Sequence, residues 1–326
     1  MSTDRDPTPH AAISRDPAPA AAANDAEWLT RRERGSSGLL RLMVRVSLGL
    51  GRPLSRAALY PIVLYFFLFA PDSRHWERRY LRLALGREPT ARDRFRHLLC
   101  FATAIHDRVF LINDREDLFD ISVDGADVIA AQLGTGKGAF LVGSHMGSFE
   151  VVNTVGKRHP GLHIVMAMYE RNARKIGATL AAINPAAKPD IIALGRLDAM
   201  LQIAERLDGG SCVGVLADRT LGAEPMQDVM LLGEPARLPT GPMRTAAVLG
   251  CAVIFMLGLY RGGNRYHVVF APVADFSNVP AGARAAAVHA AIDRYAALIE
   301  RYCRSDPHNW FNFYDFWAAR STAPRT

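Results

Sequence analysis

The sequence predicts an α/β protein with a mixed, mainly parallel sheet flanked by helices, preceded by a helical N-terminal segment. From about residue 121, short apolar runs alternate with helical patterns, which is typical of a parallel sheet covered on both faces. Residues 27–115 show helical patterns only. A length of 326 residues and a hydrophobic content of 49% are sufficient for a large buried core.

The predicted organisation has three parts. Residues 1–26 are rich in Ala, Pro and Asp without apolar periodicity, so we expect a disordered tail. This tail lacks the basic start and continuous apolar stretch of a signal peptide. Residues 27–115 form the helical segment, and residues 116–320 form the α/β core.

An apolar run at residues 57–70 stands between two arginine-rich stretches, and the chain carries a net charge of +7. The run covers 14 residues and contains Pro61, whereas a membrane-spanning helix needs about 20 residues. We therefore predict a membrane-associating segment that lies at the interface or inserts shallowly. A buried core helix is the alternative. A nucleic-acid surface is not expected. Such surfaces interleave aromatic and basic residues on a polar face, whereas here a continuous apolar run separates the two basic stretches.

The elements of the predicted core follow in chain order. Strands are expected at residues 138–144, 163–168, 190–194 and 211–217, with helices at residues 149–156, 171–183 and 197–207. Residues 218–239 contain several Gly and Pro residues and are expected to form a long loop. A helix at residues 242–249 follows. Residues 251–260 and 266–272 then predict a hairpin, which makes the sheet mixed, and residues 281–303 predict a final helix.

His145 and Glu150 are the first candidates for chemistry. They follow a predicted strand and open a predicted helix, and the carboxyl ends of strands are where α/β proteins place their sites. A neutral imidazole accepts a proton from a hydroxyl, and a carboxylate fixes its tautomer. Backbone amides near Gly143 and Gly147 are candidates for holding an oxyanion. The alternative is a His and a Glu that only cap a helix.

Asp218 and Arg219 are the second pair of candidates, because they end the strand predicted at residues 211–217. By the same rule they should lie at the sheet edge that holds His145. A guanidinium group binds phosphate or carboxylate through parallel hydrogen bonds, and Asp218 is expected to orient Arg219. A surface ion pair at the start of a loop is the alternative. Arg171 opens another helix after a strand, where it is either a substrate contact or part of a solvated face.

Seven aromatic residues fall within residues 302–317. They either cover the sheet or line a groove for an acyl chain, and packing is the simpler interpretation. The four cysteines are far apart without metal-binding or redox spacing, so neither a metal nor a cofactor is expected.

Together these features resemble the lysophospholipid acyltransferase superfamily, and within it the lauroyl/myristoyl acyltransferases of lipid A biosynthesis. That family has a membrane-associated N-terminal helix and a His-x4-Asp/Glu motif, which His145 and Glu150 match. The segment ending in Asp218-Arg219 and the sequence Pro307-His308-Asn309-Trp310 are also similar. The resemblance covers roughly residues 27–318. Ser144 stands where the glycerolipid branch often has Asn, and the chain looks like a divergent member.

The resemblance implies an acyltransferase at the cytoplasmic face of the inner membrane. The donor would be an acyl thioester of acyl carrier protein or CoA, and the acceptor a hydroxyl or amine of a lipid or glycolipid. His145 would be the general base and Glu150 its orienting carboxylate. Asp218, Arg219, Ser144, Gly147 and Arg171 would contact substrate. A catalytically silent lipid-binding protein and a thioester or ester hydrolase are the alternatives.

Overall fold

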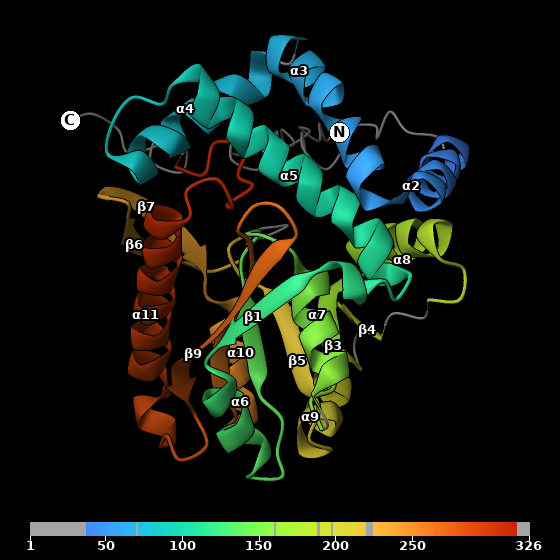
Figure 1. The fold of residues 1–326 in the computed structure, drawn as a ribbon. Helices are drawn as coiled ribbons and strands as arrows, with labels where there is room; N and C mark the ends of the chain where they lie inside the picture. The colour runs from blue at the N-terminus through green and yellow to red at the C-terminus, as the bar shows by residue number, and fades with distance from the viewer. Residues whose placement is uncertain are drawn as a thin grey trace, which may run out of the picture.

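The structure is a computed structural model that describes residues 37–69, 71–159, 161–187, 190–196, 198–219 and 224–317. The predicted N-terminal tail lies outside these residues. A seven-stranded sheet has the order β1-β9-β8-β2-β5-β3-β4 (Figure 1). Its strands are β1 (Asp120–Asp124), β2 (Phe140–Gly143), β3 (Ile164–Tyr169), β4 (Ile191–Leu194), β5 (Cys212–Leu216), β8 (Ala252–Tyr260) and β9 (Arg265–Asp275). The β8–β9 pair is antiparallel and the other neighbours are parallel, which confirms the predicted mixed sheet.

Helices cover both faces of the sheet and also one of its ends. They are α2 (Ser37–Ala57), α3 (Leu59–Phe69), α4 (Pro71–Leu85), α5 (Ala91–Ile112), α6 (Ala126–Leu133), α7 (Phe149–Arg158), α8 (Glu170–Ile183), α9 (Ala199–Asp208), α10 (Gly241–Leu249) and α11 (Arg284–Ser305), with short 3-10 helices at Glu116–Leu118 and Ala281–Ala283. In Figure 1, α3, α4 and α5 lie across one end of the sheet, and the chain after α11 runs beneath them.

Side chains of the central strands point alternately to the two faces of the sheet, and the core is therefore divided into two layers. Phe140 and Val142 of β2 face a layer shared with α9, α10 and α11. Leu141, between them, faces a layer shared with α5, α6 and α7. Side chains of neighbouring strand residues point to opposite faces, so a strand covered on both sides is apolar throughout. This explains why the strand patterns were continuous apolar runs rather than alternating ones.

The prediction of a long loop at residues 218–239 was wrong. Two antiparallel strands, β6 (Met226–Leu231) and β7 (Glu234–Pro239), form a separate two-stranded sheet in that region. The loop was expected from the Gly and Pro residues of this region, and proline cannot donate to a ladder. In a sheet of two strands, however, each strand is an edge, and an edge tolerates proline. The turn between them uses Leu232 and Gly233, both with positive φ.

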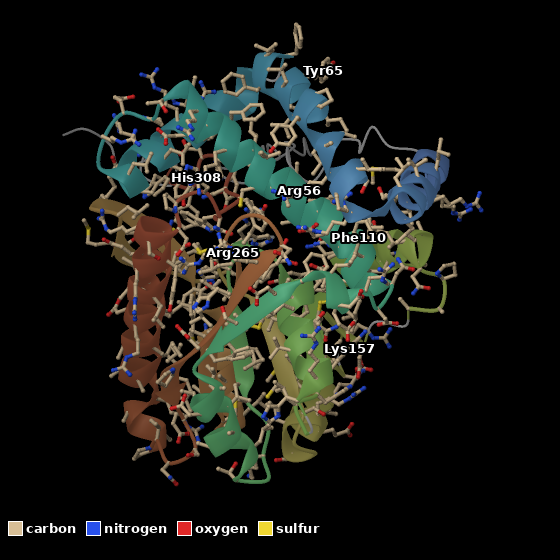
Figure 2. The ribbon with its side chains drawn as sticks, in the orientation of Figure 1. Arg56, Tyr65, Phe110, Lys157, Arg265 and His308 are labelled. Carbon is tan, nitrogen blue, oxygen red and sulfur yellow. The ribbon has the colours of Figure 1, made fainter. Side chains whose placement is uncertain are left out.

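Helix α3 is the least covered of the described helices. Val63 is its one buried residue, and Tyr65 projects outward from it (Figure 2). Side chains that are 41–67% exposed on α2 and α3 form what we call the apolar patch: Leu42, Met43, Val46, Leu50, Leu54, Tyr60, Ile62, Leu64, Tyr65, Phe66, Leu68 and Phe69. The alternative of a buried core helix is therefore wrong. Within the described ranges, none of the helices combines the length and apolarity needed to cross a membrane.

Candidate active site

Two neighbouring strands bring His145 and Asp218 together. β2 and β5 are parallel, and their last residues, Gly143 and Leu216, are register partners. His145 and Asp218 each stand two positions beyond those partners in the sequence. Both side chains therefore leave the same edge of the sheet, as expected from the rule for carboxyl strand ends.

The two residues form a directly bonded pair. Nδ1 of His145 lies 2.7 Å from Oδ1 of Asp218, and the backbone N–H of His145 donates to Oδ2 at 3.1 Å. Because an ionised carboxylate only accepts hydrogen bonds, Nδ1 must carry the proton. The lone pair of Nε2 is then available. Asp218 is fully buried as a side chain, whereas His145 retains 35% exposure, so a substrate can reach the imidazole.

The surroundings keep His145 neutral and Asp218 ionised. Burial of most of the imidazole lowers the pKa of His145, and the nearby Arg219 charge lowers it further, while Asp218 opposes both. Burial alone would raise the pKa of Asp218. His145, Arg219 and a hydrogen bond from Trp310 outweigh burial and hold that pKa well below its usual range. A neutral imidazole oriented by a carboxylate is the arrangement that a general base requires.

Glu150 lies elsewhere than expected. Its Oε1 is 2.7 Å from Nε of Arg108 on α5, and its Oε2 accepts a hydrogen bond from Ser148 at 3.0 Å. Among the described residues, no hydrogen bond joins Glu150 to His145; the carboxylate that contacts the imidazole belongs to Asp218. The physical reason is that Glu150 is in the first turn of α7, which turns its side chain toward the neighbouring α5. No sequence pattern pointed to Arg108 as its partner.

Four amides of the loop around Gly147, those of residues 145–148, are already hydrogen-bonded. His145 N–H donates to Asp218, Met146 N–H to Ser144 O, Gly147 N–H to Asn309 O, and Ser148 N–H to Gly258 O. Gly147 has φ +69°, and a Cβ there would lie 2.0 Å from the carbonyl oxygen of Gly258. Glycine at 147 thus permits close approach to β8. The neighbouring Ser144 differs, because its buried hydroxyl has no hydrogen-bond partner among the described residues.

Arg219 is held in place but retains unused donor capacity. Its terminal nitrogen donates to the carbonyl oxygen of Phe311 at 2.8 Å, and its guanidinium carbon lies 4.8 Å from the ring centre of Tyr314. Its buried Nε has no hydrogen-bond partner among the described residues. Asp218 bonds His145 and Trp310, and no bond that would orient Arg219 joins the two neighbours. Arg171 falls in α8, but its side chain lies outside the described part of the structure.

Residues 309–311, which we call the C-terminal strap, complete the site. Met146 and Trp310 form an antiparallel bridge, and the N–H of Phe311 donates to His145 O at 2.9 Å. Trp310 is fully buried and donates its indole N–H to Oδ2 of Asp218 at 3.0 Å. The aromatic residues around the strap join the core, so the packing interpretation of this run is confirmed. Sequence reasoning missed that Trp310 bonds Asp218.

An imidazole–carboxylate pair at the carboxyl ends of central parallel strands defines an α/β protein equipped for general-base chemistry. In the described ranges, no group of His, Cys, Asp or Glu side chains is arranged to hold a metal ion. The chain matches the family described as bacterial lipid A biosynthesis acyltransferase over residues 50–318, and it belongs to that family. It is therefore an acyltransferase that acts on lipid. A comparison with curated proteins finds no match.

Proposed function

We propose that this enzyme transfers a fatty acyl chain from a thioester of acyl carrier protein or CoA to a hydroxyl (or amine) of a lipid or glycolipid acceptor, in the manner of lipid A assembly. The observation that carries the proposal is the His145–Asp218 pair, with Nδ1 and Oδ1 2.7 Å apart and Nε2 left free. Membership of the lipid A acyltransferase family supports the lipid acceptor.

The proposed reaction needs one general base that takes up a proton and later releases it, and no acyl-enzyme forms. Nε2 of His145 takes the proton of the acceptor hydroxyl as its oxygen attacks the thioester carbonyl carbon. The carbonyl electrons move onto oxygen and then return as the carbon–sulfur bond breaks. The imidazolium gives its proton to the departing thiolate, which restores neutral His145. Asp218 holds the tautomer throughout and stabilises the imidazolium.

Arg219 and Ser144 are the groups we assign to substrate oxygens. The amides of residues 145–148 are already hydrogen-bonded, so side-chain donors are candidates for the developing oxyanion. Arg219 Nε and Ser144 Oγ are buried without hydrogen-bond partners among the described residues, and a buried polar group of this kind is costly unless a partner arrives. Arg219 also suits a phosphate of the donor or acceptor.

Glu150 supports the reaction indirectly in this proposal. Its carboxylate neutralises Arg108, and it accepts from the hydroxyl of Ser148 at the start of α7. These contacts fix the turn that follows His145. Glu150 is thus a positioning residue, and Asp218 takes the orienting role that the sequence motif suggested for Glu150.

The apolar patch supports attachment to a membrane surface without a spanning helix. Exposed Leu, Ile, Phe and Tyr side chains crowd α3, and water solvates such a surface poorly. Helices α2 and α3 would lie in the headgroup region with arginine side chains at its polar level. We place the enzyme at the cytoplasmic face of the inner membrane, where thioester donors are made.

Acyl transfer from a thioester to lipid acceptors, followed by mass spectrometry of the lipids, tests the proposal. Wild-type protein should yield acylated lipid, and His145→Ala should lose at least a hundredfold in rate. His163→Ala is the matched control, because this exposed histidine precedes β3 at the opposite edge of the sheet. Normal transfer by His145→Ala would overturn the mechanism. Free fatty acid without acylated product would favour a hydrolase, and absence of turnover a binding protein.

A further inference from the structure

Trp310 connects the C-terminal strap to the catalytic pair. Its indole Nε1 donates to Oδ2 of Asp218 at 3.0 Å, while Oδ1 of the same carboxylate contacts His145 at 2.7 Å. Each carboxylate oxygen therefore has its own side-chain partner, and Oδ2 also accepts from the backbone N–H of His145 at 3.1 Å. A carboxylate held at both oxygens cannot rotate about its bond to Cβ without losing one of them.

The indole is itself held rigidly. Trp310 is fully buried, and its ring packs edge-on against Tyr80 at 5.1 Å and Phe316 at 4.9 Å between ring centres. Its carbonyl oxygen lies 2.9 Å from Nε2 of the buried His97. Packing of this kind fixes a side chain in one rotamer, so the N–H direction is set before substrate binds.

The strap is anchored at its other residues as well. The side chain of Asn309 accepts from the N–H of Tyr260 at 2.8 Å and donates to the carbonyl of the same residue at 3.1 Å. Phe311 donates to His145 O and accepts from Arg219. One short segment thus contacts His145, Asp218 and Arg219. Mere packing of a tail on the core would not require bonds to all of them.

We infer that Trp310 is a positioning residue for acyl transfer, which acts by holding the Asp218 carboxylate in the orientation that presents it to His145. This inference rests on the proposed function of His145 as general base. Trp310 does not reach the substrate in this account; its effect passes through Asp218.

Replacement of the indole by a ring without an N–H tests the inference. Trp310→Phe removes the donor and keeps an aromatic ring. Without the indole N–H, we expect kcat to fall about tenfold, the usual effect of losing one hydrogen bond to a charged group. KM for the thioester should stay nearly unchanged. Asp218 and Arg219 are the charged groups that act on His145. Without the indole donor, the negative charge of the Asp218 carboxylate acts more strongly on His145 and raises its pKa. The acid limb of the pH–rate profile should therefore move to higher pH.

Trp317→Phe is the matched control. Trp317 is also buried and packs edge-on against Trp310, but its indole nitrogen has no hydrogen-bond partner among the described residues. This variant removes a similar aromatic volume without touching Asp218. It should leave kcat and the acid limb unchanged. An equal effect of both substitutions would overturn the inference, because general loss of packing would then explain it.

Two further measurements keep the test decisive. If Trp310→Phe fails to fold, benzothienylalanine incorporated at position 310 keeps the bicyclic shape and replaces the N–H by sulfur. NMR titration of the His145 ring in the full chain reports its pKa without requiring turnover. An unchanged His145 titration and wild-type kcat in the variant without the donor would refute the role of Trp310. Failure of the proposed function would instead show as wild-type protein without acyl transfer.

Discussion

Glu150 forms an ion pair with Arg108, and Oε1 and Nε lie 2.7 Å apart between α7 and α5. This pair joins α7, which starts shortly after His145, to α5, which lies across one end of the sheet. The contacts of Glu150 thus link the start of α7 to α5 and lie outside the His145–Asp218 pair.

Substitution of Glu150 should slow the reaction without changing the titration of His145. Glu150→Gln keeps the shape but weakens the attraction to Arg108, so we expect kcat/KM to fall about tenfold, with the acid limb unmoved. Arg108→Met should have a similar effect, and the double variant should lose little more. Glu116→Gln, in a looser pair with Arg158 at 3.9 Å, is the control. A shifted acid limb in Glu150→Gln would indicate contact with His145.

Asp218→Asn should be far more damaging. Wild-type activity should be retained until the pH falls below the ordinary imidazole value of 6.5, because burial and Arg219 lower the pKa of His145. The carboxylate raises this pKa, so its loss should move the acid limb to still lower pH. An amide also permits the wrong tautomer, and kcat should fall about a thousandfold. Steady-state rates measured from pH 4 to 8, roughly the range around the ordinary imidazole value, check both effects. An acid limb moved upward would contradict this assignment.

The buried pair of Arg52 and Asp107 should stabilise the attachment of α2. Nε and Oδ1 are 2.7 Å apart, and Tyr266 also donates to the carboxylate at 2.8 Å. Asp107→Asn leaves Arg52 buried without its counter-charge and should lower the free energy of unfolding by about 3 kcal/mol. Urea unfolding followed by circular dichroism measures this. Asp114→Asn, in an exposed pair with Lys157, should cost less than about 1 kcal/mol.

The same pair predicts a pH dependence of stability. Burial raises the pKa of Asp107, but the nearby His106 and the hydrogen bonds from Arg52 and Tyr266 outweigh it, so the folded-state pKa lies below the ordinary 3.8. A depressed carboxylate pKa contributes stability above the unfolded value, and that stability disappears as pH falls through the folded value. The difference between wild type and Asp107→Asn should therefore narrow only below about pH 4. A constant difference down to lower pH would contradict the ionic contribution.

The apolar patch should decide vesicle binding. A triple substitution of Leu64, Phe66 and Phe69 by Ser removes exposed side chains of α3, each of which contributes about 1.5–3 kcal/mol when buried in lipid. Cosedimentation with anionic phospholipid vesicles should fall more than about tenfold. Val248→Ser is the control, since Val248 is 66% exposed on the distant α10. Equal loss in the control would argue against a defined patch.

The sequence predicted most of the sheet because buried strands have a strong local signature. Val213 and Val215, for example, belong to a continuous apolar run with turn residues on both sides. The position of Asp218 followed from the strand-end rule alone. The partner of Glu150 did not, because it depends on how α7 is rotated against α5. The bond from Trp310 to Asp218 joins residues 92 positions apart, and no local pattern encodes such a contact.

The place of the strap in the chain has a consequence for biosynthesis. His145 and Asp218 leave the ribosome well before Trp310, which follows the last helix, α11. During translation His145 and Asp218 are present before the segment that bonds the His145 backbone and the second oxygen of the Asp218 carboxylate. Partly synthesised chains should therefore be poor catalysts even when their sheet has formed. Under the proposed mechanism, full activity would appear only after residues 309–311 have docked against His145 and Asp218.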